Sequence, residues 1–239
     1  MNRFVISAMV VAGATAVAQA QFAYVPNANE NVAGTAGLNT FIRDINAPRT
    51  GQLAIGASQL SGITPGHYIT GMSFRLYTGA TVNFPGATWS DYSIWIGPAI
   101  DLNAMTTTFA NNFSGPTTQV RSGSLTMGAN SYTVGGVPNA WGDEIAFQNG
   151  YQYTGGDIVI EIRHTGSDIT NPPNTFLDAV TSNAALGYRS YTAAGNTATV
   201  GAASTFTITR LTTSPVPEPG TFVAIGAGLA LLALRRRRK

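Results

Sequence analysis

The chain has two histidines, and they are the first side chains to consider for catalysis. His67 follows a turn signal, Thr64-Pro65-Gly66, whereas His164 ends a strand-like run. A serine hydrolase needs Ser, His and an acid to converge, and the sequence has no Gly-x-Ser-x-Gly nucleophile elbow. We therefore expect two ordinary surface histidines and no catalytic residue.

Adjacent carboxylates follow Trp141 and form the most acidic short motif of the central region. Asp143 and Glu144 could serve glycoside hydrolysis, which needs two carboxylates facing each other about 5 to 9.5 Å apart. Neighbouring side chains on a strand point to opposite faces, so a partner such as Glu161 would be required. A secreted hydrolase is therefore a distant alternative, and we expect the protein not to be an enzyme.

Metal binding is the next chemistry that the acidic residues could support. Asp and Asn oxygens on loops suit calcium, although no D-x-[DN]-x-[DN]-G loop is present. Five aspartates near turns are the candidates: Asp91, Asp101, Asp157, Asp168 and Asp178. We expect no cofactor and name no metal ligand, and one structural calcium ion is the alternative. The absence of Cys excludes disulfides and thiol catalysis.

Tryptophan side chains supply the best hint of a binding surface. Trp95 lies between Ile94 and Ile96, so if the isoleucines face a core, Trp95 faces outward or packs on a second layer. Aromatic faces pair with the apolar faces of sugars. Trp95 and Trp141 are therefore candidates for sugar stacking, and core packing is the alternative.

Short alternating segments would have to position these residues. Residues 157–163 place Ile158, Ile160 and Ile162 on one face and Val159, Glu161 and Arg163 on the other. Similar segments are 73–77, 92–96 and 204–211, with further candidates at 53–57, 119–127 and 186–191. Gly- and Pro-rich turns separate them. This pattern predicts an all-β fold, a β-sandwich of the jelly-roll type, as one domain over residues 21–211.

Charge is scarce in the chain, and its distribution excludes one class of function. Charged residues make up 10% of the sequence and hydrophobic residues 44%. Between Gln21 and Ser214 there are seven Arg, no Lys and ten acidic residues, a net charge of −3. A nucleic-acid-binding domain needs a basic stripe for phosphates, so we expect no nucleic-acid partner.

The N-terminus has the organisation of a secretory signal peptide over residues 1–20. Arg3 precedes an apolar stretch, and Ala18 and Ala20 form a small-x-small cleavage site. Cleavage after Ala20 would leave Gln21 as the new terminus, and an uncleaved anchor is the alternative. In either case the helix would carry the domain out of the cytoplasm.

The C-terminus combines a linker at 212–220, an apolar segment at 221–234 and a basic tail at 235–239. Fourteen helical residues span about 21 Å, less than the roughly 30 Å of a bilayer core. The tail residues are all basic: Arg235, Arg236, Arg237, Arg238 and Lys239. Such a cluster stops transfer on the cytoplasmic side. We therefore expect a single transmembrane helix that is a marginal permanent anchor.

The order of these parts resembles a known sorting signal. Pro217, Glu218 and Pro219, a short apolar helix and a terminal Arg cluster are similar to the PEP-CTERM signal of Gram-negative bacteria. The resemblance implies processing by exosortase, a membrane-embedded protease-transferase, and an association with exopolysaccharide and biofilm. Prolines favour an extended backbone, which a protease cleft can bind.

These observations predict an exported protein that begins as an inner-membrane-anchored precursor and ends at the cell surface or outside the cell. Its expected role is structural or adhesive, within or near exopolysaccharide. The expected partners are an exosortase-like protease, the membrane before processing, and exopolysaccharide. A carbohydrate-binding β-sandwich module is the first alternative.

Overall fold

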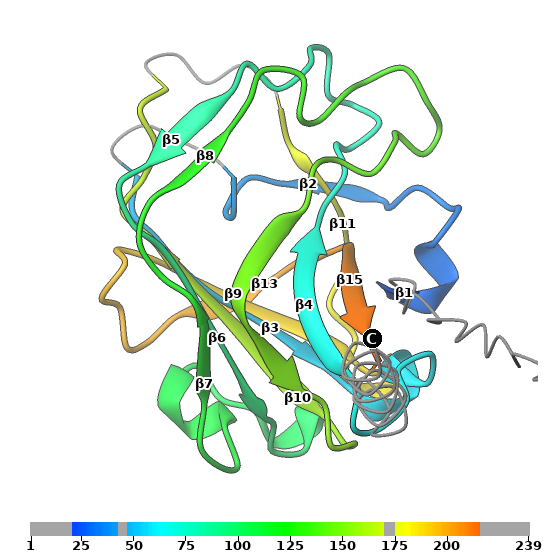
Figure 1. Cartoon of the computed structure of the whole chain (residues 1–239), viewed down its shortest axis with the longest axis vertical. Helices are drawn as coiled ribbons and strands as arrows, with labels where there is room; N and C mark the ends of the chain where they lie inside the picture. The colour runs from blue at the N-terminus through cyan, green and yellow to red at the C-terminus, as the bar shows by residue number, and fades with distance from the viewer. Residues whose placement is uncertain (1–20, 43–46, 170–174, 216–239) are drawn as a thin grey trace, which may run out of the picture.

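The computed structural model describes residues 21–42, 47–169 and 175–215, and the described part consists mostly of antiparallel β-strands (Figure 1). This confirms the all-β class. Its helical elements are short 3-10 turns: η1 (Asn27–Asn29), η2 (Ala57–Leu60), η3 (Leu102–Ala104), η4 (Phe109–Asn112) and η5 (Ala184–Leu186). No helix in the described part is long and apolar enough to cross a membrane. The predicted signal helix and transmembrane helix lie outside the described residues.

The larger sheet has six antiparallel strands. Their spatial order is β13 (Ala202–Ser204), β12 (Tyr188–Ala194), β3 (Arg49–Ile55), β10 (Ile158–His164), β6 (Tyr92–Pro98) and β7 (Thr118–Arg121). β10 is central and pairs with both β3 and β6 over seven residues each. Its alternation of Ile158, Ile160 and Ile162 puts these three buried side chains on the inner face.

A second sheet of four antiparallel strands carries both ends of the described chain. Its order is β1 (Gln21–Val25), β15 (Thr209–Ser214), β4 (Tyr68–Ser73) and β9 (Ile145–Gln152). In the register of β1 and β15, Gln21 lies opposite Thr213. The first residue after the predicted signal cleavage thus lies beside the strand that leads to the C-terminal segment.

Two smaller sheets complete the described structure. One contains β14 (Phe206–Thr207), β11 (Leu177–Val180) and β2 (Ala36–Leu38), and the other pairs β5 (Ala87–Trp89) with β8 (Leu125–Met127). The β5–β8 ribbon lies at the top of Figure 1. Between the two larger sheets, β7 and β9 lie near each other, where the Gln148 side chain bonds the backbone N–H and C=O of Ser122 at 2.9 Å each.

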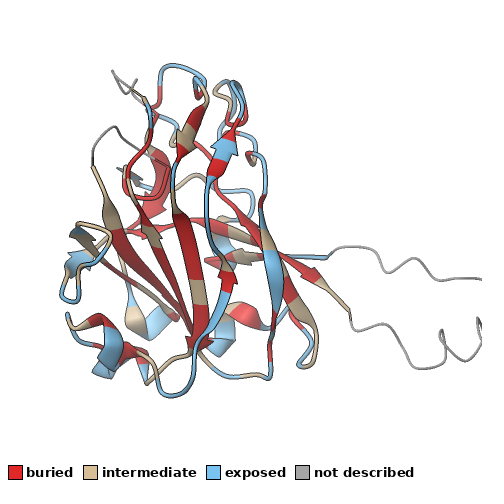
Figure 2. Cartoon of the chain, turned by 60° about the vertical axis from the view of Figure 1, so that its left-hand side comes forward, coloured by how far each residue is buried: buried red, intermediate tan, exposed pale blue. Residues whose placement is uncertain are grey.

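One hydrophobic core joins the inner faces of the two larger sheets. Ile94, Ile96 and Ile160 come from the six-stranded sheet, and Met72 and Leu211 come from the four-stranded sheet, all with no exposed surface. Figure 2 shows buried residues following the central strands, with exposed residues gathered in turns and edges. Removal of this apolar surface from water is the main stabilising contribution to the fold.

A second, smaller core lies on the outer face of the six-stranded sheet. The segment that contains η3 and η4 covers part of this face, and its Leu102, Met105 and Phe109 pack on Ala54 of β3 and Val159 of β10. The outward residues of β10 are therefore buried at one end of the strand. Toward the other end, the same face remains open.

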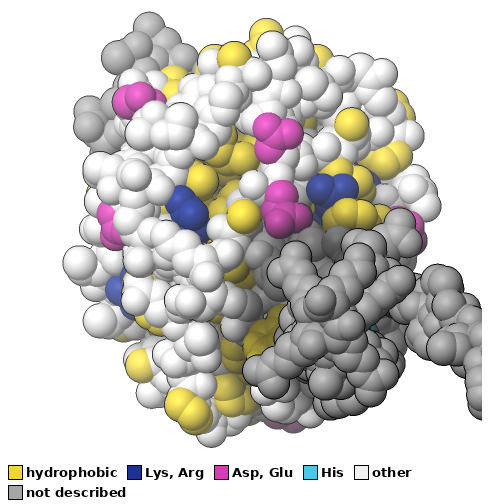
Figure 3. Space-filling model, viewed as in Figure 1, with side chains coloured by type: hydrophobic (Ala, Val, Ile, Leu, Met, Phe, Trp, Pro, Cys, Tyr) yellow, Lys and Arg dark blue, Asp and Glu magenta, His cyan; other side chains and the backbone are white. Residues whose placement is uncertain are grey.

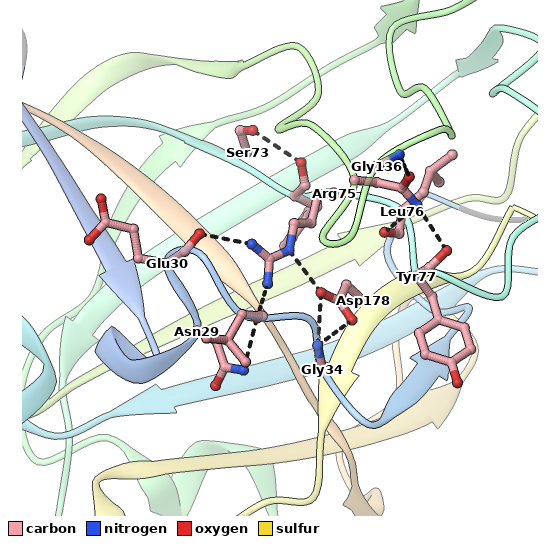
Figure 4. Close-up of polar contacts among 12 residues, drawn as sticks. Asn29, Glu30, Gly34, Ser73, Arg75, Leu76, Tyr77, Gly136 and Asp178 are labelled. Atoms are coloured by element: carbon pink, nitrogen blue, oxygen red, sulfur yellow. Dashed lines mark hydrogen bonds and ion pairs between the residues drawn. The ribbon is translucent and has the colours of Figure 1, made fainter.

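A buried ion pair fixes the N-terminal segment to the sheets (Figure 4). The Arg75 Nε donates to Asp178 Oδ2 at 2.8 Å, and neither side chain has exposed surface. The guanidinium also donates to the carbonyls of Glu30 and Val32, and the Gly34 N–H donates to Asp178. Burial raises the pKa of Asp178, and the Arg75 hydrogen bond opposes this shift. Both charges are thus compensated within a buried site.

Several predicted strands occur close to their expected places. β6 and β10 match segments 92–96 and 157–163. Of the expected strand at 73–77, only Ser73 belongs to a strand, β4, and Arg75 and Leu76 form isolated bridges. The segment 119–127 forms two strands, β7 and β8, which pair in different sheets. β15 continues to Ser214, three residues past the domain boundary expected at 211, because pairing with β1 and β4 extends it.

Candidate functional site

Trp95 lies on the outer face of the six-stranded sheet, as its position between two isoleucines predicts. Ile94 and Ile96 are fully buried in the core, and Trp95 is half-buried on the opposite side of β6. Its cross-strand neighbour on β10 is Glu161. The Arg163 guanidinium carbon lies 6.0 Å from the centroid of the Trp95 ring. An aromatic face, a carboxylate and a guanidinium therefore meet on this surface.

Two adjoining open hollows surround these side chains, and we call them together the Trp95 groove. The first, of about 290 Å³, is lined by Trp95, Phe113, Thr117, Glu161 and Arg163. The second, of about 430 Å³, shares the last four of these residues and extends toward η4 and the end of the β12–β13 turn. Gly97 makes the close approach of Phe113 to the sheet feasible, because a Cβ there would lie 3.0 Å from the Phe113 ring.

A chain of hydrogen bonds holds the polar groups of the groove in place. The Arg163 Nε donates to Glu161 Oε1 at 2.7 Å, and the Gln52 Nε2 donates to Glu161 Oε2 at 2.7 Å. Behind them, the Asn112 amide donates to Gln52 Oε1 at 2.8 Å. Gln52 and Asn112 have no exposed surface, and Glu161 is 7% exposed. The network fixes the orientation of the Glu161 carboxylate.

Trp141, the other stacking candidate, lies away from the groove. It forms an isolated bridge with Arg75 beyond the end of β4, and its ring packs on Tyr24 of β1 with centroids 5.5 Å apart. Two guanidiniums lie over the Trp141 ring, those of Arg75 at 5.0 Å and Arg210 at 5.5 Å. The structure therefore does not bring Trp95 and Trp141 together, and the surroundings of Trp141 are those of a packed side chain.

The acidic residues considered for hydrolysis are also separated. Asp143 and Glu144 are exposed and directly precede β9 in the four-stranded sheet, whereas Glu161 is buried on β10 in the six-stranded sheet. Glu144 accepts a hydrogen bond from the Thr212 hydroxyl, and Glu161 is held by Gln52 and Arg163. The three carboxylates do not form a facing pair.

The expectation of a surface position is wrong for His164, which has no exposed surface. Its ring stacks on Tyr92 at 5.6 Å with an interplanar angle of 6°. The Gly166 N–H donates to Nδ1 at 3.1 Å, so Nε2 carries the proton and donates to the Thr40 carbonyl at 2.7 Å. Burial lowers the pKa of His164 to about 4. The residue is a neutral part of the core.

The aspartates proposed for calcium mostly support loop backbones. Asp101 accepts from the Asn103 N–H, Asp157 from the Ala57 N–H, and Asp168 from the Thr88 N–H, whereas Asp178 pairs with Arg75. Asp101 and Asp157 line one open hollow of about 290 Å³. Over residues 21–42, 47–169 and 175–215, no three His, Asp or Glu side chains gather as a metal-binding group.

The surface of the domain is mainly polar and uncharged. On the face shown in Figure 3, most of the surface is neither hydrophobic nor charged, and acidic and basic side chains are scattered. This agrees with a sequence that has 10% charged residues.

The sequence did not indicate several residues of the groove or of the hydrogen-bond network behind it. Gln52 lies on β3, which starts at Arg49 and not at the predicted residue 53. The alternation of Thr50 and Gln52 with Leu53 and Ile55 was an available signal for the longer strand. Phe113 and Thr117 belong to an irregular segment after η4, and no periodic pattern could have placed them beside Trp95.

Comparison with protein families identifies the C-terminal segment. Residues 215–238 match the family described as the PEP-CTERM protein-sorting motif, which confirms the predicted sorting signal. The motif marks an exported protein that is targeted to an exosortase, a membrane enzyme, and whose membrane-anchored precursor is processed to the cell surface. The match does not extend into the β-strand domain. Comparisons with curated proteins and with solved structures found no match.

Proposed function

We propose that residues 21–214 form a non-catalytic domain that acts as a structural or adhesive protein at the cell surface or in an exopolysaccharide matrix. The observation that carries the proposal is the direct junction of domain and sorting signal. β15 ends at Ser214, and the sorting motif begins at residue 215. The folded domain is therefore the cargo of the sorting signal.

The fold is suited to such a role, and we interpret it as a jelly-roll β-sandwich. The eight strands concerned are β1, β3, β4, β6, β7, β9, β10 and β15. We number these strands one to eight along the chain. In the four-stranded sheet they then lie side by side in the order 1-8-3-6, and in the six-stranded sheet in the order 2-7-4-5. This is the double Greek-key order of a jelly roll, an architecture of lectin and capsid domains. β11 to β14 are then an insertion before the last strand.

Carbohydrate binding is the second candidate function, and the Trp95 groove favours it. A hydrolase is less well supported, because glycoside hydrolysis needs two opposed carboxylates. Among the described residues that line the groove, Glu161 is the only carboxylate. It is already held by Arg163 and Gln52.

Mass spectrometry of protein recovered from the surface of the native host tests the sorting step. We expect the mature protein to lack residues 221–239 and to begin at Gln21. A variant with Pro217→Ala, Glu218→Gln and Pro219→Ala should keep its tail and remain in the membrane fraction. Surface protein that retains its full C-terminus would contradict the proposal.

The structural or adhesive role needs a separate test in the host. A deletion strain should retain less extracellular polysaccharide and aggregate less than the parent, and the wild-type chain should restore both properties. The chain with the altered Pro-Glu-Pro motif is the matched control, because its domain is intact but undelivered. Unchanged aggregation and polysaccharide retention after deletion would refute this role.

A further inference from the structure

We infer that the Trp95 groove is a binding site for a neutral polysaccharide, with one pyranose ring placed against the Trp95 indole. The inference rests on the proposed surface role and adds to it a ligand class and a position. Its first support is that Trp95 is half-buried and lines a hollow, instead of packing in either core. Ligand sites are concave and combine aromatic side chains with a few placed polar groups, and the Trp95 hollow has both.

Charge favours a neutral sugar over an acidic one. The Arg163 guanidinium is the cation of the groove, and it donates to Glu161 at 2.7 Å and to the Asn196 carbonyl at 3.2 Å. A uronate or sulfate that approached Arg163 would also approach the Glu161 carboxylate, which would repel it. Sugar hydroxyls can instead accept from the guanidinium and donate to the carboxylate.

Preorganisation is the third support for the site. Glu161 cannot turn away from the groove without losing hydrogen bonds to both Gln52 and Arg163. Gln52 is in turn held by Asn112 and by the carbonyl of Phe109 in η4. A polar pair that is already held in place reduces the entropy lost when a ligand binds.

The shape of the groove favours a chain over a single sugar. Its two hollows adjoin along Phe113, Thr117, Glu161 and Arg163, and together they run along the outer face of the sheet from β6 toward the β12–β13 turn. An open groove of this kind admits an internal segment of a polymer, which a closed pocket would not. The site therefore suits attachment to the side of a polysaccharide strand.

Affinity electrophoresis of the protein exported by its native host tests the inference. Dextran, xylan and hydroxyethyl cellulose are the neutral probes, and polygalacturonate and hyaluronan are the acidic ones. We expect retardation by at least one neutral polymer and none by the acidic polymers. Trp95→Ala should weaken the retention about tenfold, whereas Trp141→Ala, which removes the same side chain away from the groove, should bind like wild type. Glu161→Gln leaves Arg163 uncompensated and should create retardation by polygalacturonate.

The inference would be overturned by no retardation by any neutral polymer, by retardation of the wild type by the acidic polymers, or by equal binding of wild type and Trp95→Ala. A loss of polymer binding with Trp141→Ala alone would indicate a site beside the four-stranded sheet and would also overturn the inference. Thermal unfolding of each variant shows whether a loss of binding is a loss of fold. Failure of the sorting test leaves this result intact, because the binding assay does not depend on where the protein is delivered.

Discussion

Protonation of the buried His164 gives a sharp prediction for stability against pH. The pKa of His164 is lowered from 6.5 to about 4 by burial. The unfolded chain therefore binds a proton below pH 6.5 that the folded chain does not bind until about pH 4. By linkage, the contribution of His164 to the free energy of unfolding is complete above pH 6.5 and is lost as the pH falls from 6.5 to about 4. The loss is about 2 kcal/mol at pH 5 and about 3 kcal/mol at pH 4.

Urea unfolding of the mature protein, followed by tryptophan fluorescence, measures this effect. His164→Gln can still donate to the Thr40 carbonyl but cannot titrate, and His164→Asn keeps an acceptor near the Gly166 N–H. Both variants should be less stable than wild type at pH 7. Their deficit should shrink by about 2 kcal/mol between pH 7 and pH 5, because only the wild type loses the histidine contribution. A deficit that stays constant, or grows on acidification, would refute a neutral buried histidine.

Two further predictions concern stability at neutral pH. Asp178→Asn should cost about 3 to 5 kcal/mol, because it leaves the Arg75 charge buried without its partner. A cost below about 1 kcal/mol in chemical denaturation would argue against a buried ion pair. Gly142→Ala should cost about 1 to 3 kcal/mol, because its Cβ would lie 2.2 Å from the Tyr132 ring. Gly62→Ala, which meets nothing within 4 Å, is the matched control and should change the melting temperature little.

The strands that sequence could predict are those whose two faces differ. Residues Ile158, Ile160 and Ile162 alternate with Val159, Glu161 and Arg163, and the structure has β10 there. The same logic placed Trp95 outside the core. β9 carried no such signal beyond its start at Ile145, since Gln148, Asn149 and Gly150 are exposed and follow no alternation.

The candidate site was predictable only in part, because its residues meet through tertiary structure. The sequence indicated Trp95 as a surface aromatic and offered Glu161 as a possible partner for Asp143 or Glu144. It could not show that Glu161 pairs instead with Arg163, two residues along the same strand. The burial of His164 was not predictable for a related reason. A histidine at the end of a strand is expected to be exposed, and the ring that stacks on His164 belongs to Tyr92, on a strand far away in the sequence.

The position of β15 has a mechanical consequence for a protein attached through its C-terminus. β15 lies between β1 and β4 and is paired with both. Tension that enters at Ser214 pulls along the strand, so the hydrogen bonds of both ladders are loaded in shear and must break together instead of one at a time. A tether joined to an edge strand would load only one ladder. An attachment at Ser214 would therefore distribute tension over two hydrogen-bonded ladders.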